Sequence, residues 1–233
     1  MIQVNQLNKS FGNKEVLRDI SFSVGEGRII GLFGTNGAGK STLLKVIAGL
    51  LRIDHGSITF HSHPSSIEKR SLIAYLGEQD TWYPWMKLSD AMDYMKDMYR
   101  DWDHEKAQYL LNFFQLDKNE RIREVSKGTL CKMNLLLTLS RRAKYVLLDE
   151  PFSGIDPFTR REISKAIVDD FVDEGQTIIV ATQEIEEVEM LLDEILFLDQ
   201  GQLLLHEQAE ELRRTNKQGL LGILEEVYAH ARM

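Results

Sequence analysis

The chain has 233 residues, of which 43% are hydrophobic and 27% charged, with only 4 prolines and 16 glycines. This is ordinary globular usage, and it excludes collagen-like, low-complexity and largely disordered chains. The 28 Lys and Arg against 36 Asp and Glu give a net charge of −8. Such an acidic balance argues against a protein whose main affinity is for nucleic acid, which requires a clustered positive field.

A single cysteine, Cys131, excludes an intramolecular disulfide framework. Residues 1–12 lack the basic start and apolar core of a secretory signal. The longest apolar stretches, such as 43–51, fall well short of the roughly 18 residues that a membrane-spanning helix needs. We therefore expect a cytoplasmic protein that works at a membrane only if another chain supplies the span.

Apolar runs in the first part of the chain predict strands at 2–7, 20–24, 28–34, 57–60 and 72–76. The run at 28–34 is nearly continuous, which is typical of a strand buried on both faces. A glycine-rich turn follows it, and then a helix over about 39–51. Helical spacing of apolar residues over 88–114 continues through 133–140.

Strand patterns return at 145–148, 177–181 and 195–198, with helical patterns at 157–172 and 184–192 between them. This alternation predicts an α/β protein with a parallel sheet covered on both faces. Gln200-Gly201 between two strand-like runs predicts a hairpin. We expect one domain over 1–233, made of a sheet core, an inserted helical segment and a helical tail: 1–84 with 141–206, 85–140, and 207–233.

The strongest motif is GTNGAGKST at residues 34–42, which fits G-x-x-x-x-G-K-S/T between a predicted buried strand and a predicted helix. Its glycines let successive backbone N–H groups point at phosphate oxygens at the start of a helix. A glycine-rich helix cap without a ligand is the far weaker alternative. We expect the whole loop to hold a nucleotide through Gly34, Thr35, Asn36, Gly37, Ala38, Gly39, Lys40, Ser41 and Thr42.

Two acidic residues follow the buried strand at 145–148 and supply the second half of such a site. Lys40 brings a positive charge to the phosphates, and the Ser41 hydroxyl suits Mg²⁺. Asp149 is expected to bind the same Mg²⁺, directly or through water. Glu150 is placed to polarise an attacking water as a general base.

These motifs, in this order, make residues 1–205 resemble the ATP-binding subunits of ABC transporters. SGID at 153–156 matches that family's D-loop, and VSKGT at 125–129 stands where its LSGGQ signature belongs. Phe11 matches the aromatic residue that stacks on adenine, with Val16 as a small apolar contact. The resemblance implies a P-loop NTPase with a RecA-like parallel-sheet core, an N-terminal antiparallel β subdomain and an inserted α-helical subdomain.

Lys127 and Thr129 depart from the family signature, whereas Ser126 and Gly128 keep the hydroxyl and the open backbone expected to meet a γ-phosphate. This S-K-G variant resembles bacterial exporter ATPases of the ABC-2 type, including a subgroup linked to antibiotic response. YRDWD at 99–103 is similar to that subgroup as well.

Two further positions differ from the family pattern. The Q-loop glutamine, a metal-contacting residue, falls on Glu78 or on Gln79, and the sequence does not decide between them. The switch histidine is replaced by Gln183, whose amide can donate to a γ-phosphate but cannot become cationic. We therefore expect Gln183 to act at the catalytic centre with slower turnover than a histidine would give.

The resemblance also implies partners. Ser126 and Gly128 would complete the site of a second nucleotide-binding subunit in a head-to-tail dimer around ATP and Mg²⁺. A separate transmembrane permease subunit would receive the motion at the cytoplasmic face of the cell membrane. The aromatic residues of WYPWM at 82–86 are either its docking surface or the core of a junction between subdomains.

The leading function is therefore ATP hydrolysis that drives the transport of a solute, with a drug- or antibiotic-type solute favoured and the direction of transport left open. The alternative is an ATP-binding regulatory module with negligible hydrolysis, because the switch and signature positions are altered. A soluble ABC ATPase of DNA repair or translation fits poorly, since the chain has no room for a coiled-coil insertion or a tandem unit. His61 and His63 are expected to lie in an exposed turn and not in a metal site.

Overall fold

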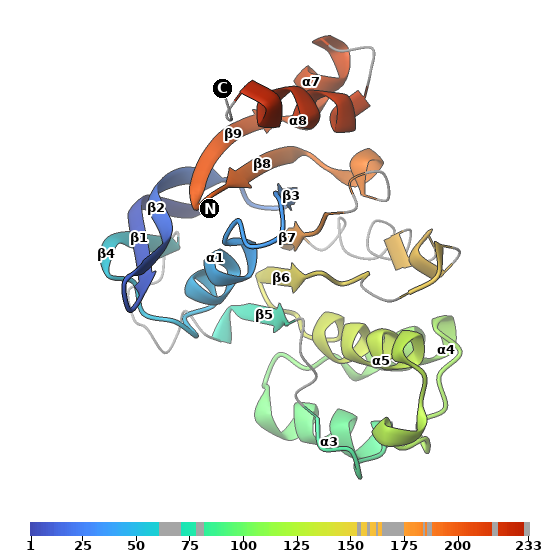
Figure 1. Ribbon diagram of the computed structural model, residues 1–233. Helices are drawn as coiled ribbons and strands as arrows, with labels where there is room; N and C mark the ends of the chain where they lie inside the picture. The colour runs from blue at the N-terminus through green and yellow to red at the C-terminus, as the bar shows by residue number, and fades with distance from the viewer. Residues whose placement is uncertain are drawn as a thin grey trace.

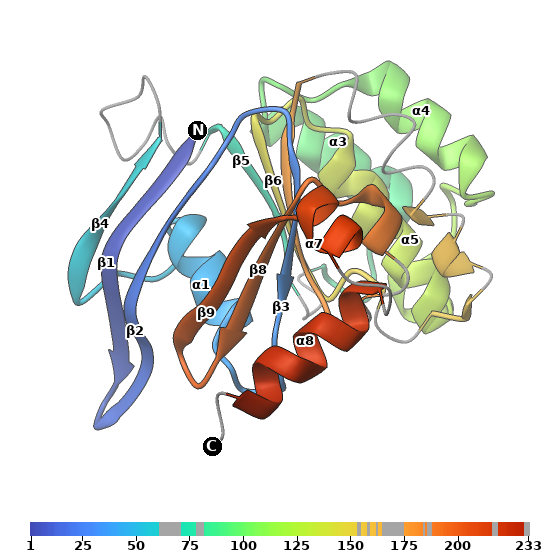
Figure 2. The same cartoon turned by 90° about the horizontal axis from the view of Figure 1, so that it is seen from above.

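The computed structural model describes residues 1–60, 71–77, 82–152, 155–157, 159–161, 163–164, 175–183, 185, 188–215 and 219–230. Two sheets organise the chain (Figures 1 and 2). One is antiparallel, in the order β2-β1-β4, from Lys14–Val24, Ile2–Phe11 and His55–Phe60. The other has the order β5-β6-β7-β3-β8-β9, from Ile73–Leu76, Tyr145–Asp149, Thr177–Ala181, Ile29–Phe33, Glu194–Asp199 and Gln202–Gln208.

The centre of the larger sheet is parallel and fully buried. Strands β5, β6, β7, β3 and β8 run parallel to their neighbours, and β9 closes the edge antiparallel to β8. Every residue of β3, β6 and β7 is buried, which explains their continuous apolar runs. The predicted parallel sheet and N-terminal antiparallel sheet are therefore confirmed.

Helix α1, Lys40–Ile47, lies between the two sheets (Figure 2). Its buried residues share a core with inward residues of both sheets, among them Leu43, Leu147 and Ile20. The helix ends earlier than the predicted limit of residue 51, because the chain turns at Gly49, whose φ of +72° suits glycine.

A group of helices packs on the other face of the sheet and forms a second core with it (Figure 2). The predicted helical block over 88–114 is two helices, because Asp103 begins a new one by accepting a hydrogen bond from the Lys106 N–H. Ser126 caps the last helix in the same manner. The group consists of α3 Leu88–Met98, α4 His104–Phe113, the short 3₁₀ helix η1 Ile122–Glu124, and α5 Lys127–Leu139.

Arg141 ties the helical group to the sheet edge. Its side chain is 4% exposed and donates to the Ile73 carbonyl at 2.7 Å and to both carboxylate oxygens of Asp101 at 3.1 and 2.9 Å. The guanidinium also stacks 3.9 Å from the ring centre of Tyr99. A buried cation with this many partners fixes how the loop at 99–103 sits against β5.

The C-terminal part begins with the predicted hairpin, which the structure confirms: Gln200 and Gly201 both take positive φ between β8 and β9. The helical tail starts at residue 209 and not at 207, because β9 continues to Gln208. The predicted helix at 157–172 lies largely outside the described residues. Of the predicted helix at 184–192, the described residues 185 and 188–192 contain a short 3₁₀ helix. The remaining elements are the 3₁₀ helix η3 Glu189–Leu191, α7 Ala209–Thr215 and α8 Gly219–His230.

Candidate functional site

A cleft of about 750 Å³ lies at the carboxyl ends of the central strands, beside the loop that joins β3 to α1. Loop residues 35–42 line it together with four other predicted residues, Phe11, Val16, Glu150 and Gln183. The chain thus brings a β-hairpin and the ends of β3, β6 and β7 to one hollow. Clefts at this edge of a parallel sheet are where ligands bind in α/β proteins.

The loop at 34–42 has the backbone that an anion cradle requires. Gly34 has a φ of +153°, and a Cβ there would lie 2.1 Å from the Leu198 carbonyl oxygen, so only glycine fits. Gly37, with a φ of +80°, has open space around it. The cap residue of α1 is Gly39, which has no side chain to cover the first N–H groups. These N–H groups and the helix dipole suit the phosphates of a nucleotide.

Lys40 is held over this loop. Its side chain is 6% exposed, and its ammonium donates to the Gly34 carbonyl at 2.8 Å. It also lies 3.6 Å from the Glu150 carboxylate. Because a buried cation needs partners, these contacts fix the Lys40 charge at the floor of the cleft, where phosphate oxygens would meet it.

The predicted metal residues Ser41 and Asp149 lie together. The Ser41 hydroxyl donates to Asp149 Oδ1 at 2.9 Å, and Tyr75 donates to Asp149 Oδ2 at 3.2 Å. A hydroxyl and a carboxylate are the hard oxygen donors that Mg²⁺ prefers, so these residues fit the ion. Within the described ranges, His, Cys, Asp and Glu do not gather in threes as an independent metal cluster. Glu78 and Gln79 lie outside the described residues.

Glu150 stands in a strained backbone conformation, with a φ of +49°. Its N–H donates to the Ala181 carbonyl at 2.8 Å, which holds the turn against the end of β7. The side chain is 17% exposed and reaches the cleft beside Lys40. A carboxylate in this place is positioned to accept a proton from water next to a bound phosphate.

Gln183, at the switch position, donates from its amide to the Asn36 Oδ1 at 2.8 Å. At the cleft mouth, Phe11 is 49% exposed with the Lys9 ammonium 5.2 Å from its ring centre. Phe11 therefore offers an open aromatic face of the kind on which a base stacks, and Val16 lines the cleft as well.

The signature residues lie apart from this cleft. Ser126 is exposed at the start of α5 and accepts a hydrogen bond from the Thr129 N–H at 3.1 Å. A Cβ added to Gly128 would meet only the Ser126 hydroxyl, at 3.9 Å, so the N-terminal turn of α5 is open. Neither Ser126 nor Gly128 lines the cleft. Residues 153 and 154 of the predicted D-loop are outside the described ranges.

Some residues of the site were not predicted. Lys14, Phe152 and Thr182 also line the cleft. Asp199 accepts a hydrogen bond from Thr35 at 3.1 Å, and Tyr75 contacts Asp149. Tyr75 and Asp199 each lie near the end of a strand of the same sheet, and the strand order that brings them to the loop is a property of the fold and not of any motif.

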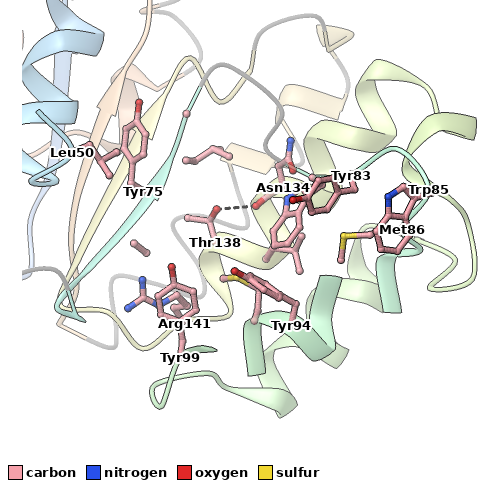
Figure 3. Close-up of a pocket in the computed structure, with 16 residues that line it drawn as sticks. Leu50, Tyr75, Tyr83, Trp85, Met86, Tyr94, Tyr99, Asn134, Thr138 and Arg141 are labelled. Atoms are coloured by element: carbon pink, nitrogen blue, oxygen red, sulfur yellow. Dashed lines mark hydrogen bonds between the residues drawn. The ribbon is translucent and has the colours of Figure 1, made fainter. Parts of the chain in front are cut away.

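A second hollow, of about 650 Å³, lies between the sheet edge and the helical group (Figure 3). Tyr83 and Trp85 on its rim are 65% and 64% exposed, and their rings stack at 5.6 Å. Met86 is buried in the helical core, and Trp82 packs edge-on against Tyr94 at 5.9 Å. Segment 82–86 thus combines both predicted features, junction core and exposed aromatic surface. We call this hollow the aromatic groove.

Among the described residues, every helix is too short or too polar to cross a membrane.

Comparisons with known proteins agree on the family. The profile of the ABC transporter family matches residues 17–153. The chain is 30% identical over 208 residues to the ABC transporter ATP-binding protein YtrB of Bacillus subtilis, covering 87% of this chain and 70% of YtrB. It is 29% identical over 210 residues to the lantibiotic transport ATP-binding protein SrtF of Streptococcus pyogenes, covering 89% of this chain and 91% of SrtF.

Solved structures share the whole fold. An ATP-binding subunit of an ABC transporter superposes with a TM-score of 0.85 at 24% identity, covering 100% of both chains. The cassette MJ0796, in a dimeric post-hydrolysis state with ADP and phosphate, superposes with a TM-score of 0.80 at 20% identity, covering 90% of this chain and 99% of MJ0796. These likenesses confirm the predicted P-loop NTPase fold. The chain therefore belongs to the ABC transporter family, as an ATP-binding subunit.

Proposed function

We propose that this chain hydrolyses Mg-ATP and that the reaction drives solute transport through a separate membrane subunit. The observation that carries the proposal is the meeting of four groups at the phosphate loop: Lys40 lies 3.6 Å from Glu150, and Ser41 lies 2.9 Å from Asp149. Phosphate binding needs Lys40, metal binding needs Ser41 and Asp149, and water activation needs Glu150. These four residues belong to one loop with its helix start and to one strand end.

The residues divide the chemistry as follows. The loop N–H groups and Lys40 bind and neutralise the β- and γ-phosphates, and Phe11 stacks on the adenine. Ser41 and Asp149 hold Mg²⁺, which when bound offsets charge on the phosphate oxygens. Glu150 accepts a proton from the attacking water. Gln183 leaves Asn36 and donates its amide to the γ-phosphate.

The site is completed by a second copy. Ser126 and Gly128 are accessible at the start of α5 and do not line their own cleft. A two-fold axis that places α5 of one chain over the phosphate loop of another gives each γ-phosphate a second set of donors. Hydrolysis removes these charge-assisted contacts, so the pair opens after each turnover. The name of the MJ0796 structure, a dimeric cassette, supports this arrangement.

The membrane partner docks in the aromatic groove. Stacked, exposed Tyr83 and Trp85 are typical anchors of a protein interface, and the groove abuts the helical group that carries Ser126. A chain docked in this way lies at the cytoplasmic face of the cell membrane. The helical segment 85–140 then transmits the opening and closing of the ATPase pair to the membrane subunit. The name of SrtF, a lantibiotic transport protein, supports an antibiotic-type compound as the transported solute.

A phosphate-release assay with Mg-ATP, with and without the membrane subunit, tests this function. We expect turnover that Lys40→Ala abolishes and that the membrane subunit stimulates. The second candidate is the regulatory module, which the Gln183–Asn36 bond favours because it occupies the amide that would otherwise donate to a γ-phosphate. ATP binding without turnover in both assays would select that module.

A further inference from the structure

The Tyr75 hydroxyl contacts the carboxylate of Asp149, the residue predicted to bind the metal, and the sheet register explains why. Tyr75 of β5 pairs with Leu147 of β6, so Asp149 lies two residues further along the neighbouring strand. Residues at this diagonal spacing point to the same face of the sheet, which is the face covered by α1. The tyrosine is long enough to reach the Asp149 carboxylate, and its hydroxyl donates to Oδ2 at 3.2 Å.

The carboxylate is thereby held from two sides. Oδ1 accepts from Ser41 on α1 at 2.9 Å, while Oδ2 accepts from Tyr75 on β5. Asp149 is 1% exposed, so water contributes little to its orientation. Rotation of the carboxylate about its Cβ–Cγ bond breaks both contacts at once. Tyr75 therefore helps to fix which oxygen faces the Ser41 hydroxyl and the phosphate loop.

The surroundings of Tyr75 restrict its ring as well. A Cβ added to Gly77 would lie 3.2 Å from the ring Cε1 and 3.4 Å from the hydroxyl, so the ring is packed closely over the Gly77 backbone. The ring also lines the aromatic groove, beside Leu50 and away from Trp85 (Figure 3). A ring packed against the backbone in this way is a firm support for a hydrogen bond, because it loses little rotamer freedom in making it.

We propose that Tyr75 is a positioning residue for the metal: its hydroxyl orients Asp149 and so sets the affinity of the site for Mg²⁺. This inference rests on the proposed Mg-ATP site. Mutation of a partner that orients a metal-binding carboxylate typically weakens metal affinity by about 10- to 100-fold. Tyr75 does not line the nucleotide cleft, so we expect its effect on the metal and not on the phosphates.

The test compares Tyr75→Phe with Tyr94→Phe in the full chain. Tyr75→Phe removes one oxygen and keeps the ring that packs over Gly77. Tyr94→Phe removes a hydroxyl from the same groove, where the ring of Tyr94 packs against Trp82. Binding of a fluorescent ATP analogue is titrated with MgCl₂, and again in EDTA, and thermal melting confirms that each variant is folded.

We expect Tyr75→Phe to raise the Mg²⁺ concentration at half-saturation about tenfold, with analogue binding in EDTA unchanged. Tyr94→Phe should match the parent in both assays. Equal Mg²⁺ midpoints for Tyr75→Phe and the parent would overturn the inference and leave the proposed function standing. An equal loss in EDTA would also overturn it, by placing the effect on the phosphate loop. A parent chain that binds no analogue would overturn the proposed function and this inference together.

Discussion

The amide of Gln183 donates a 2.8 Å hydrogen bond to the side chain of Asn36, which links the end of β7 to the phosphate loop. Asn36 lies two residues into the loop, where the γ-phosphate of a bound nucleotide would approach. The Gln183 side chain thus lies at the phosphate loop. It has to exchange one acceptor for another when a triphosphate binds.

We expect Gln183→His to hydrolyse ATP faster than the parent. A cationic imidazole offers a charge-assisted hydrogen bond, which is stronger than a neutral amide bond by roughly 1.5 kcal/mol, or about tenfold in rate. The gain should be largest below about pH 6.5, where the imidazole carries its charge. Steady-state phosphate release across pH measures it, with Gln183→Ala as the control that should be slower than the parent. Identical rates for all three chains would show that this position has no catalytic role.

Glu150→Gln should bind nucleotide and fail to turn it over. The amide keeps the size of the side chain but cannot accept the proton from water, a role worth about 10²- to 10⁴-fold in rate. Single-turnover hydrolysis and analogue binding separate the two effects. Glu210→Gln, on an exposed residue of α7, should behave as the parent. Hydrolysis at the parental rate by Glu150→Gln would refute the assignment of Glu150 as the base.

Two adjacent arginines offer a test of the helical group. Arg141 is buried and contacts Asp101, Ile73 and Tyr99. Arg141→Met removes the guanidinium that pairs with the Asp101 carboxylate, and it should lower the free energy of unfolding by about 3–5 kcal/mol. Arg142 pairs with Asp103 but its side chain is 68% exposed, and Arg142→Met should cost less than about 1 kcal/mol. Urea unfolding of both variants measures the difference. Equal losses would show that the Arg141 contacts do not hold the group to the sheet.

The stability of the chain should depend on pH through Glu26. Hydrogen bonds from Lys144 and from the N-terminal ammonium lower the pKa of Glu26 to about 2, from an ordinary value of 4.5. A lowered pKa means that the folded state favours the ionised form, so this stabilisation is present above about pH 4.5 and is lost as the pH falls toward 2.

Glu26→Gln should therefore be less stable than the parent at pH 7 and equal to it near pH 2. Because the Glu26 side chain is 43% exposed, solvent screening keeps the difference below about 1 kcal/mol. Chemical denaturation at both pH values measures it. A larger deficit at the lower pH would contradict the assignment of the pKa shift.

Much of the site was predictable because its residues are tied to local chain geometry. The glycines of the loop, Lys40 and Ser41 follow one another in sequence, and Asp149 and Glu150 end a strand whose apolar run marks it as buried. The parallel sheet then brings strand ends to one edge, and this is why Asp149 and Glu150 lie beside the loop.

The rest depended on contacts between distant strands. Tyr75 reaches Asp149 only because β5 and β6 are neighbours in one register, and Asp199 reaches Thr35 because β8 lies beside β3. The positive φ of Glu150 could not be predicted either, because positive φ is usually marked by glycine and not by an acidic residue. Likewise, the division of the 88–114 block into α3 and α4 depends on a single cap at Asp103, which periodicity does not reveal.

The most direct test of the central claim, that ATP is held between two copies, is the mass in solution. Light scattering of Glu150→Gln, which retains ATP, should give 26.8 kDa without nucleotide and about twice that with Mg-ATP. ADP should not produce the pair, and Ser126→Ala combined with Glu150→Gln should prevent it. A chain that stays at 26.8 kDa with saturating Mg-ATP, alone and with its membrane subunit's cytoplasmic loops, would contradict the account.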